Sequence, residues 1–262
     1  MPPAEPHGSL LIETWLHAGR ILTRLRRDRF VLMGSLLLPI SFLTLYEVVL
    51  GARVQQLTGE SSVYGLVPIC AILSGLFGSL GNAASVALDR ESGLLSRIWV
   101  LPIHRASPLL GRVLAEAVRA LVGTLLIVLL GMPLGLRFAN GALAALIFLL
   151  IPAAVVVGFT SLVLALAIRR NARTLMAWLI SVTIALAFIN PGFSPIETFP
   201  PWIQPFVRMQ PMSPPVETMR ALASGGPIAW SLTMTLLWTI LLLAAFTPIA
   251  VRGFRAAAEA SA

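Results

Sequence analysis

Six apolar runs, each about as long as a bilayer is thick, limit what this chain can fold into. The second run, Val63 to Leu88, holds no charged residue. About twenty apolar residues in a helix cross the hydrocarbon core of a membrane, and a backbone in contact with lipid must satisfy its own hydrogen bonds. The runs therefore predict six membrane-spanning helices: Val31 to Leu50, Val63 to Leu88, Val113 to Leu136, Ala142 to Ile168, Thr174 to Phe193 and Ile228 to Val251.

The fold class that follows is an all-α polytopic membrane protein. Hydrophobic residues make up 57% of the chain and charged residues 11%, whereas a soluble domain carries about twice that charged fraction. We predict an N-terminal tail with an interfacial helix over residues 1–30, a six-span domain over 31–251 and a C-terminal tail over 252–262.

An amphipathic helix is predicted from Ser9 to about Arg29. Leu11, Trp15, Ala18, Leu22 and Leu25 recur at helical spacing on one face, and Glu13, His17, Arg20, Arg24 and Arg27 recur on the opposite face. A helix with a basic face and a Leu/Trp face favours the headgroup plane of a membrane. The alternative is a helix that packs on a cytosolic core.

Arginine placement predicts the orientation of the chain. All 19 basic residues are arginines, and most of them lie before the first span, between the second and third spans, between the fourth and fifth, and after the sixth. The positive-inside rule then places both termini on the cytoplasmic side of the plasma membrane.

A chain without lysine cannot form a Walker A loop, so ATP, if it is used, must bind to another chain. Charge at membrane ends also accounts for the net +8, so we assign no nucleic-acid role.

A charged segment over residues 89–108 separates the second and third runs. Gly93 can end a helix, and the apolar residues that follow it recur on one helical face until Pro102. Ser107 and Pro108 predict an N-cap and a first helical position for the next helix. Two interpretations stay open: a docking surface for another protein, or a topogenic loop whose arginines fix only the orientation.

Two polar stripes are candidates for a substrate path. In the second run the stripe is Ser74, Gly78, Asn82 and Ser85, and in the fifth it is Thr174, Trp178, Ser181 and Phe188. We predict that the two stripes face one cavity. Close packing of helices through small residues is the alternative for the first stripe.

Three charged residues of the third run, Arg112, Glu116 and Arg119, have the spacing of ion pairs along one helix near the cytoplasmic interface. An unpaired charge deeper in the bilayer would be costly. The alternative role for Glu116 is proton coupling in a proton-driven drug exporter.

The region 194–227 is rich in proline and large apolar residues. It predicts short helices that dip back into the outer leaflet or cap the bundle, or else a loose Pro-rich loop.

Signals for catalysis are poor, because no histidine has a neighbour at metal-ligand spacing and Cys70 is the single cysteine. No catalytic or metal-binding residue is assigned, which disfavours a membrane-integral enzyme of lipid metabolism.

Two passages carry a resemblance to a known family. They are DRESGLLSRIWVLPIHRAS, at 89–107, and GFSPIETFPPWIQPFVRMQPMSPPVETMRAL, at 192–222. Together with the order of the predicted helices, the chain resembles the permease subunits of ABC-2 type transporters. Within that family it is similar to the daunorubicin/doxorubicin-resistance permeases of the DrrB and DrrC type.

The resemblance implies an exporter subunit that works with a second permease chain, identical or related, and with two ATPase subunits that hold ATP and Mg²⁺. The family's coupling helix falls here on Arg90, Glu91, Gly93, Leu94, Leu95, Arg97, Ile98 and Trp99. The implied cargo is a hydrophobic or amphipathic drug or lipid, and no cofactor is expected on this chain itself.

Overall fold

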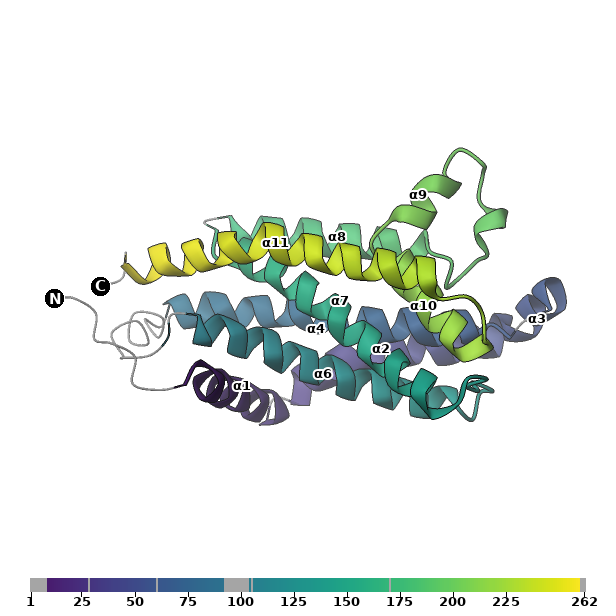
Figure 1. The fold of residues 1–262 in the computed structure, drawn as a ribbon, viewed down its shortest axis with the longest axis horizontal. Coiled ribbons are helices and arrows are strands. Elements are labelled where there is room, and N and C mark those ends of the chain that lie inside the picture. The colour runs from purple at the N-terminus through teal and green to yellow at the C-terminus, as the bar shows by residue number, and fades with distance from the viewer. Residues whose placement is uncertain are drawn as a thin grey trace.

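A computed structural model describes residues 9–27, 29–59, 61–91, 104, 106–169 and 171–259. The described parts form a bundle of long helices that run roughly along one axis (Figure 1). The long helices are α1 (Leu10–Arg27), α2 (Arg29–Tyr46), α4 (Val63–Glu91), α6 (Ser107–Gly131), α7 (Gly141–Ala167), α8 (Ala172–Phe188) and α11 (Ala229–Glu259). Shorter elements are η1 (Glu47–Gly51), α3 (Ala52–Thr58), η2 (Ile196–Thr198), α9 (Gln204–Met209) and α10 (Ser213–Ser224).

Helix α4 is the centre of the bundle. It packs against α2, α6, α7, α8 and α10, and the side chains from Val63 to Gly81 are almost all buried. Helix α11, by contrast, packs mainly on α7 and leaves most of its apolar surface exposed. An uncharged apolar helix such as α4 is therefore covered by protein, while the outer helices present apolar side chains to the surroundings of the bundle.

Four helices in the described chain, α4, α6, α7 and α11, are long and apolar enough to cross a membrane. Two more apolar stretches, Pro39–Val49 of α2 and Ala172–Phe188, are shorter. All six predicted spans thus coincide with apolar helices, and the described structure establishes a multi-pass helical protein. A count of six crossings stays a prediction.

The two ends of the bundle differ in what they carry. Helix α1, the start of α6 and the last turns of α11 lie at one end, and α3 and α10 lie at the other (Figure 1). The helical ends that flank the charged segment 89–108 therefore lie at the same end as α1.

The predicted loop from Gly51 to Ser62 is wrong over most of its length. The chain stays helical through η1 and α3, because Tyr46, Gly51 and Ala52 all keep right-handed helical backbone angles. Five residues, Glu47–Gly51, form a π-helix, which accommodates an added residue without ending the helix. The helix ends at Gly59, whose φ of 74° is left-handed and suits glycine.

Helix α6 begins and ends earlier than the sequence predicts. Ala106 occupies the N-cap, and Ser107 is instead the first helical residue, with its hydroxyl donating to the His104 carbonyl at 2.7 Å. The helix stops at Gly131, not Leu136, because Gly135 adopts a φ of 109° and the Leu136 N–H returns to the Gly131 carbonyl at 2.9 Å.

The region 194–227 contains η2, α9 and α10. Helix α10 packs against α4, α7 and α11, so it closes that end of the bundle. Helix α9 projects to the side (Figure 1) and is tied to α11 by the Trp238 indole N–H, which donates to the Met209 carbonyl at 2.9 Å.

Candidate functional site

A buried ion pair lies between the helices that flank the charged segment. Arg119 of α6 donates through Nε and Nη2 to Oε2 of Glu116, at 2.9 and 2.7 Å. Glu116 is 0% exposed and Arg119 is 7% exposed. Burying either charge alone would be expensive, so each side chain is tolerated here because the other accompanies it.

The same guanidinium reaches across to α4. Arg119 donates to the Gly75 carbonyl at 2.8 Å and to the Ser74 carbonyl at 3.3 Å. Ser79, one turn further along α4, donates to Oε2 of Glu116 at 3.3 Å and lies 3.0 Å from the Thr160 hydroxyl of α7. We call this set, Glu116, Arg119, Ser74, Gly75, Ser79 and Thr160, the polar node. It joins α4, α6 and α7.

Gly78 makes room for the polar node. A Cβ built on Gly78 would overlap the guanidinium of Arg119, whereas one built on Gly81 would meet nothing within 4 Å. The small residues of α4 are therefore needed where Arg119 crosses it. This outcome agrees with the packing alternative for Ser74 and Gly78 rather than with an open substrate path.

The ion pair does not lie at the end of its helix. Arg119 stands in the middle of the 25-residue helix α6, roughly 18 Å from Ser107 at 1.5 Å per residue. Arg112 is also buried on α6. Sequence spacing indicated the pairing but not its further partners, because Ser79, Thr160 and the α4 carbonyls belong to other helices.

Helix α1 docks on α6 at the same end of the bundle as the charged segment. Glu13 accepts hydrogen bonds from the backbone N–H of His104 at 2.8 Å and from its Nδ1 at 3.2 Å. At Gly111 of α6 an added Cβ would lie 2.5 Å from the Cβ of His17. The backbones of α1 and α6 are therefore close enough that Gly111 admits no larger residue without a shift.

This docking shows which residues of α1 face the bundle. Glu13 of the predicted polar face is 8% exposed, whereas Trp15 of the predicted apolar face is 66% exposed. Ala18 turns toward α6 with Glu13, and Leu11, Ile12, Trp15 and Leu16 form an apolar surface that faces away from the protein. Helical spacing could not show that His104, distant in sequence, supplies the partner that buries a carboxylate.

The local environment of Glu13 favours its ionised form. Burial by itself would raise the pKa of this carboxyl, but the backbone and side-chain hydrogen bonds from His104 outweigh burial and leave the pKa below its usual value. The contact between α1 and the start of α6 is therefore strongest when Glu13 is charged.

The described members of the two predicted stripes differ in burial. Ser74 is buried in the polar node, while Thr174, Trp178 and Ser181 lie on the exposed side of α8. Trp178 is 68% exposed and Phe188 is 62% exposed. The side chains of Asn82 and Ser85 are outside the described set. Within the described residues no cluster of His, Cys, Asp or Glu could hold a metal ion.

Comparison with known proteins decides the family. The model of the family described as ABC-2 type transporter matches residues 13–223, which includes the docked part of α1, the polar node and α10. The chain belongs to the ABC-2 type transporter family. That range also contains both passages on which the resemblance rests.

Two curated members of the ABC-2 family match along almost the whole chain. The chain is 36% identical to the "Probable doxorubicin resistance ABC transporter permease protein DrrC" of Mycobacterium tuberculosis, over 94% of this chain and 89% of the relative. It is 27% identical to the "Daunorubicin resistance ABC transporter permease protein DrrB1" of Streptomyces coeruleorubidus, over 92% of this chain and 86% of the relative. Both are ABC transporter permeases by name.

The predicted coupling residues of this ABC-2 chain lie mostly outside the described residues. Gly93, Leu94, Leu95, Arg97, Ile98 and Trp99 fall in the stretch 92–103, and the side chains of Arg90 and Glu91 are not described either. The flanking structure is clear: α4 ends at Glu91, α6 begins at Ser107, and the polar node holds these two helices together.

Proposed function

We propose that this chain is the membrane-spanning subunit of an ATP-driven exporter, which moves a hydrophobic or amphipathic drug or lipid out across the plasma membrane. Separate ATPase subunits, two in each complex, supply the energy, and a second permease chain completes the pathway. The names of the relatives, which concern doxorubicin and daunorubicin resistance, support the cargo class. The absence of lysine, and with it of any Walker A motif, supports hydrolysis on a partner.

The observation that carries the proposal is the polar node. The coupling segment joins the end of α4 to the start of α6, and Arg119 links both helices in mid-bundle. A displacement of the segment by a docked ATPase would therefore move α4 and α6 together. Ser79 and Thr160 pass the displacement to α7. ATP binding then biases an equilibrium between two packings of the bundle.

Orientation forms part of the proposal. Six spans with both termini in the cytoplasm would place the coupling segment beside the ATPases and α10 at the outer face. Arg20, Arg24 and Arg252 are exposed on the helices found at the α1 end of the bundle (Figure 1). This distribution supports a cytoplasmic α1 end by the positive-inside rule.

Copurification tests the coupling. Replacing Leu95 and Trp99 with aspartate should abolish recovery of the ATPase with the tagged permease, because both residues belong to the apolar face of the coupling segment. The matched control is Trp202→Asp, a tryptophan 79% exposed beyond α8, which should retain the ATPase. Full ATPase recovery with both coupling residues replaced would count against the docking assignment.

Reconstitution tests the energy source. Vesicles that contain the permease and its ATPases should export cargo only when ATP is supplied. Export should continue when the proton gradient is collapsed. Uphill export by vesicles that contain this chain alone would overturn the proposal. It would favour the proton-driven alternative, in which Glu116→Gln should then stop transport.

A further inference from the structure

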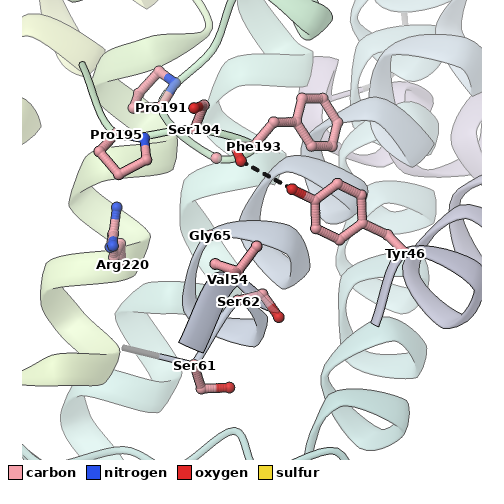
Figure 2. A pocket seen from close by; sticks show the side chains of 11 residues that line it. Tyr46, Val54, Ser61, Ser62, Gly65, Pro191, Phe193, Ser194, Pro195 and Arg220 are labelled. Carbon is pink, nitrogen blue, oxygen red and sulfur yellow. Dashed lines mark hydrogen bonds between the residues drawn. The ribbon is translucent and has the colours of Figure 1, made fainter. Parts of the chain in front are cut away.

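A recess opens at the end of the bundle opposite α1. It is a shallow, half-open recess, with a volume of about 20 Å³ for atoms the size of a water molecule. Four segments form its walls: Tyr46 and Val54 of α3, the residues Ser61 and Ser62 just before α4, the loop Pro191–Pro195, and Arg220 of α10. Figure 2 shows Arg220 on one side of the recess and Tyr46 on the other, with the loop above them.

The walls of the recess are held in place. The Tyr46 hydroxyl donates to the Phe193 carbonyl at 3.1 Å (Figure 2). Gly65 of α4 and Gly192 of the loop touch through their backbones, and a Cβ on Gly192 would lie 2.9 Å from the Gly65 carbonyl oxygen. Asn190 also fastens the loop, because its side-chain oxygen accepts from the Gly192 N–H at 2.9 Å. The recess is therefore preformed.

One positive charge lines the recess. Among the lining residues, Arg220 is the one with a charged side chain, and Glu217 of the same helix interacts with it electrostatically. Glu47 lies nearby, but its carboxylate accepts from the Ser62 hydroxyl and packs against Gly51 on its own helix. Arg220 has other interactions within the chain, and a guanidinium has enough N–H groups to serve several acceptors. The hydroxyl of Ser61 offers a further donor.

An aromatic cluster adjoins the recess. Phe193 forms an edge contact with Phe42 at 5.2 Å and stacks with Phe188 of α8 at 6.0 Å. Phe188 is 62% exposed, so the cluster continues from the recess to the outer surface of the bundle. One polar cationic wall beside an exposed aromatic surface matches a molecule with an anionic head and an apolar body.

We infer that this recess binds the phosphate group of a phospholipid, with Arg220 as the phosphate ligand and the Phe188–Phe193 pair against the start of the acyl chains. A guanidinium recognises phosphate through paired hydrogen bonds. The site is separate from the coupling segment and the polar node. It requires neither ATP nor the partner subunits, so its test is independent of the proposed export.

The test is lipid binding by the purified full-length chain in detergent micelles. Phosphatidylglycerol is titrated, and bound lipid is followed by native mass spectrometry. Arg220→Gln should weaken binding about tenfold, since loss of one charge-assisted contact of about 1.4 kcal/mol has that effect. The matched control is Arg137→Gln, because Arg137 is exposed and donates to the carbonyls of Met132 and Leu136 in its own loop. Binding by the control should stay unchanged.

Two further ligands show whether the recess recognises the phosphate group, the acyl chains or both. A diglucosyl diacylglycerol, which has acyl chains but no phosphate, should bind weakly and without dependence on Arg220. Inorganic phosphate should compete only at far higher concentration than the lipid. Equal binding of the phosphate-free glycolipid, or equal losses in the Arg220 and Arg137 variants, would overturn the inference. Inorganic phosphate binding as tightly as the lipid would overturn the lipid assignment.

The variant Arg220→Lys distinguishes a loss of phosphate recognition from a general defect in folding. Lysine keeps the charge but loses the paired geometry, so this variant should bind phosphatidylglycerol between the wild type and Arg220→Gln. If Arg220→Lys has the same thermal unfolding midpoint as the wild type and still binds phosphatidylglycerol no better than Arg220→Gln does, recognition of the lipid by charge is excluded.

Discussion

At the scale of single residues, Arg119 makes more contacts between helices than its position in an apolar helix suggests. Its guanidinium serves one carboxylate on its own helix and two backbone carbonyls of α4. The carbonyls belong to the backbone and cannot be removed by mutation, and Glu116 is the one acidic residue among the six that make up the polar node. The stability of the α4–α6 contact should therefore depend on the pair as a unit.

Removing one partner of the pair should cost more than removing both. Glu116→Gln leaves a buried guanidinium without its counter-charge, and we expect unfolding in detergent to become easier by about 3–5 kcal/mol. Glu116→Gln with Arg119→Met should recover most of this loss, because the guanidinium at position 119 is removed together with its counter-charge. The measurement is a double-mutant cycle from denaturant unfolding. Additive losses would mean that the two side chains do not interact.

Gly78 gives a sharper test of the same contact. Gly78→Ala places a methyl group where Arg119 lies, while Gly81→Ala meets open space. The midpoint temperature of thermal unfolding should fall clearly for Gly78→Ala. For Gly81→Ala it should stay the same or rise, since alanine stabilises a helix by about 1 kcal/mol relative to glycine. Similar midpoints for the two variants would show that Arg119 does not cross α4 at Gly78.

At the scale of elements, the docking of α1 on α6 depends on pH through Glu13. The pKa of this carboxyl is lowered in the folded chain from an ordinary value of 4.5. A lowered carboxyl pKa contributes stability that is complete above the ordinary value and is lost as the pH falls through the folded value. The α1–α6 contact should therefore be unchanged at neutral pH and should loosen below about pH 4.5.

The measurement is a distance between spin labels on α1 and α6. Cysteines at Gly19 and Leu110, both exposed, carry the labels in a Cys70→Ala background. The distance distribution should broaden below the ordinary pKa in the wild type. Glu13→Gln should show the broad distribution at every pH, and a pH-dependent distance in that variant would assign the effect to another group.

At the scale of the whole molecule, orientation can be read by chemical labelling. In the Cys70→Ala background, single cysteines at Gln55 and Ala139 should react with a membrane-impermeant maleimide in intact cells. Cysteines at Gly19 and Ala256 should react only after lysis. All four positions are exposed, so a difference reports the membrane side. Labelling of Gly19 in intact cells would reverse the proposed orientation.

The sequence predicts the helices of this molecule well and their contacts poorly. The apolar runs locate α4 and α7 to within a few residues, because length and hydropathy are local properties. The burial of Glu13 and the contacts of Arg119 with α4 were not predicted, because their partners, His104 and the α4 carbonyls, are brought to them by packing. The recess at Arg220 was not predicted at all, since its four walls come from segments far apart along the chain.

The π-helix at Glu47–Gly51 has a consequence for how this chain tolerates change in length. Such a bulge is equivalent to one residue inserted into a regular helix, so deleting a single residue there would restore the ordinary α-helical phase. The residues on both sides of the bulge would then keep their orientation, including Val54, which lines the recess. A one-codon deletion at this point should therefore be absorbed locally, whereas the same deletion in the regular part of α2 would turn the downstream helix about its axis by about 100°.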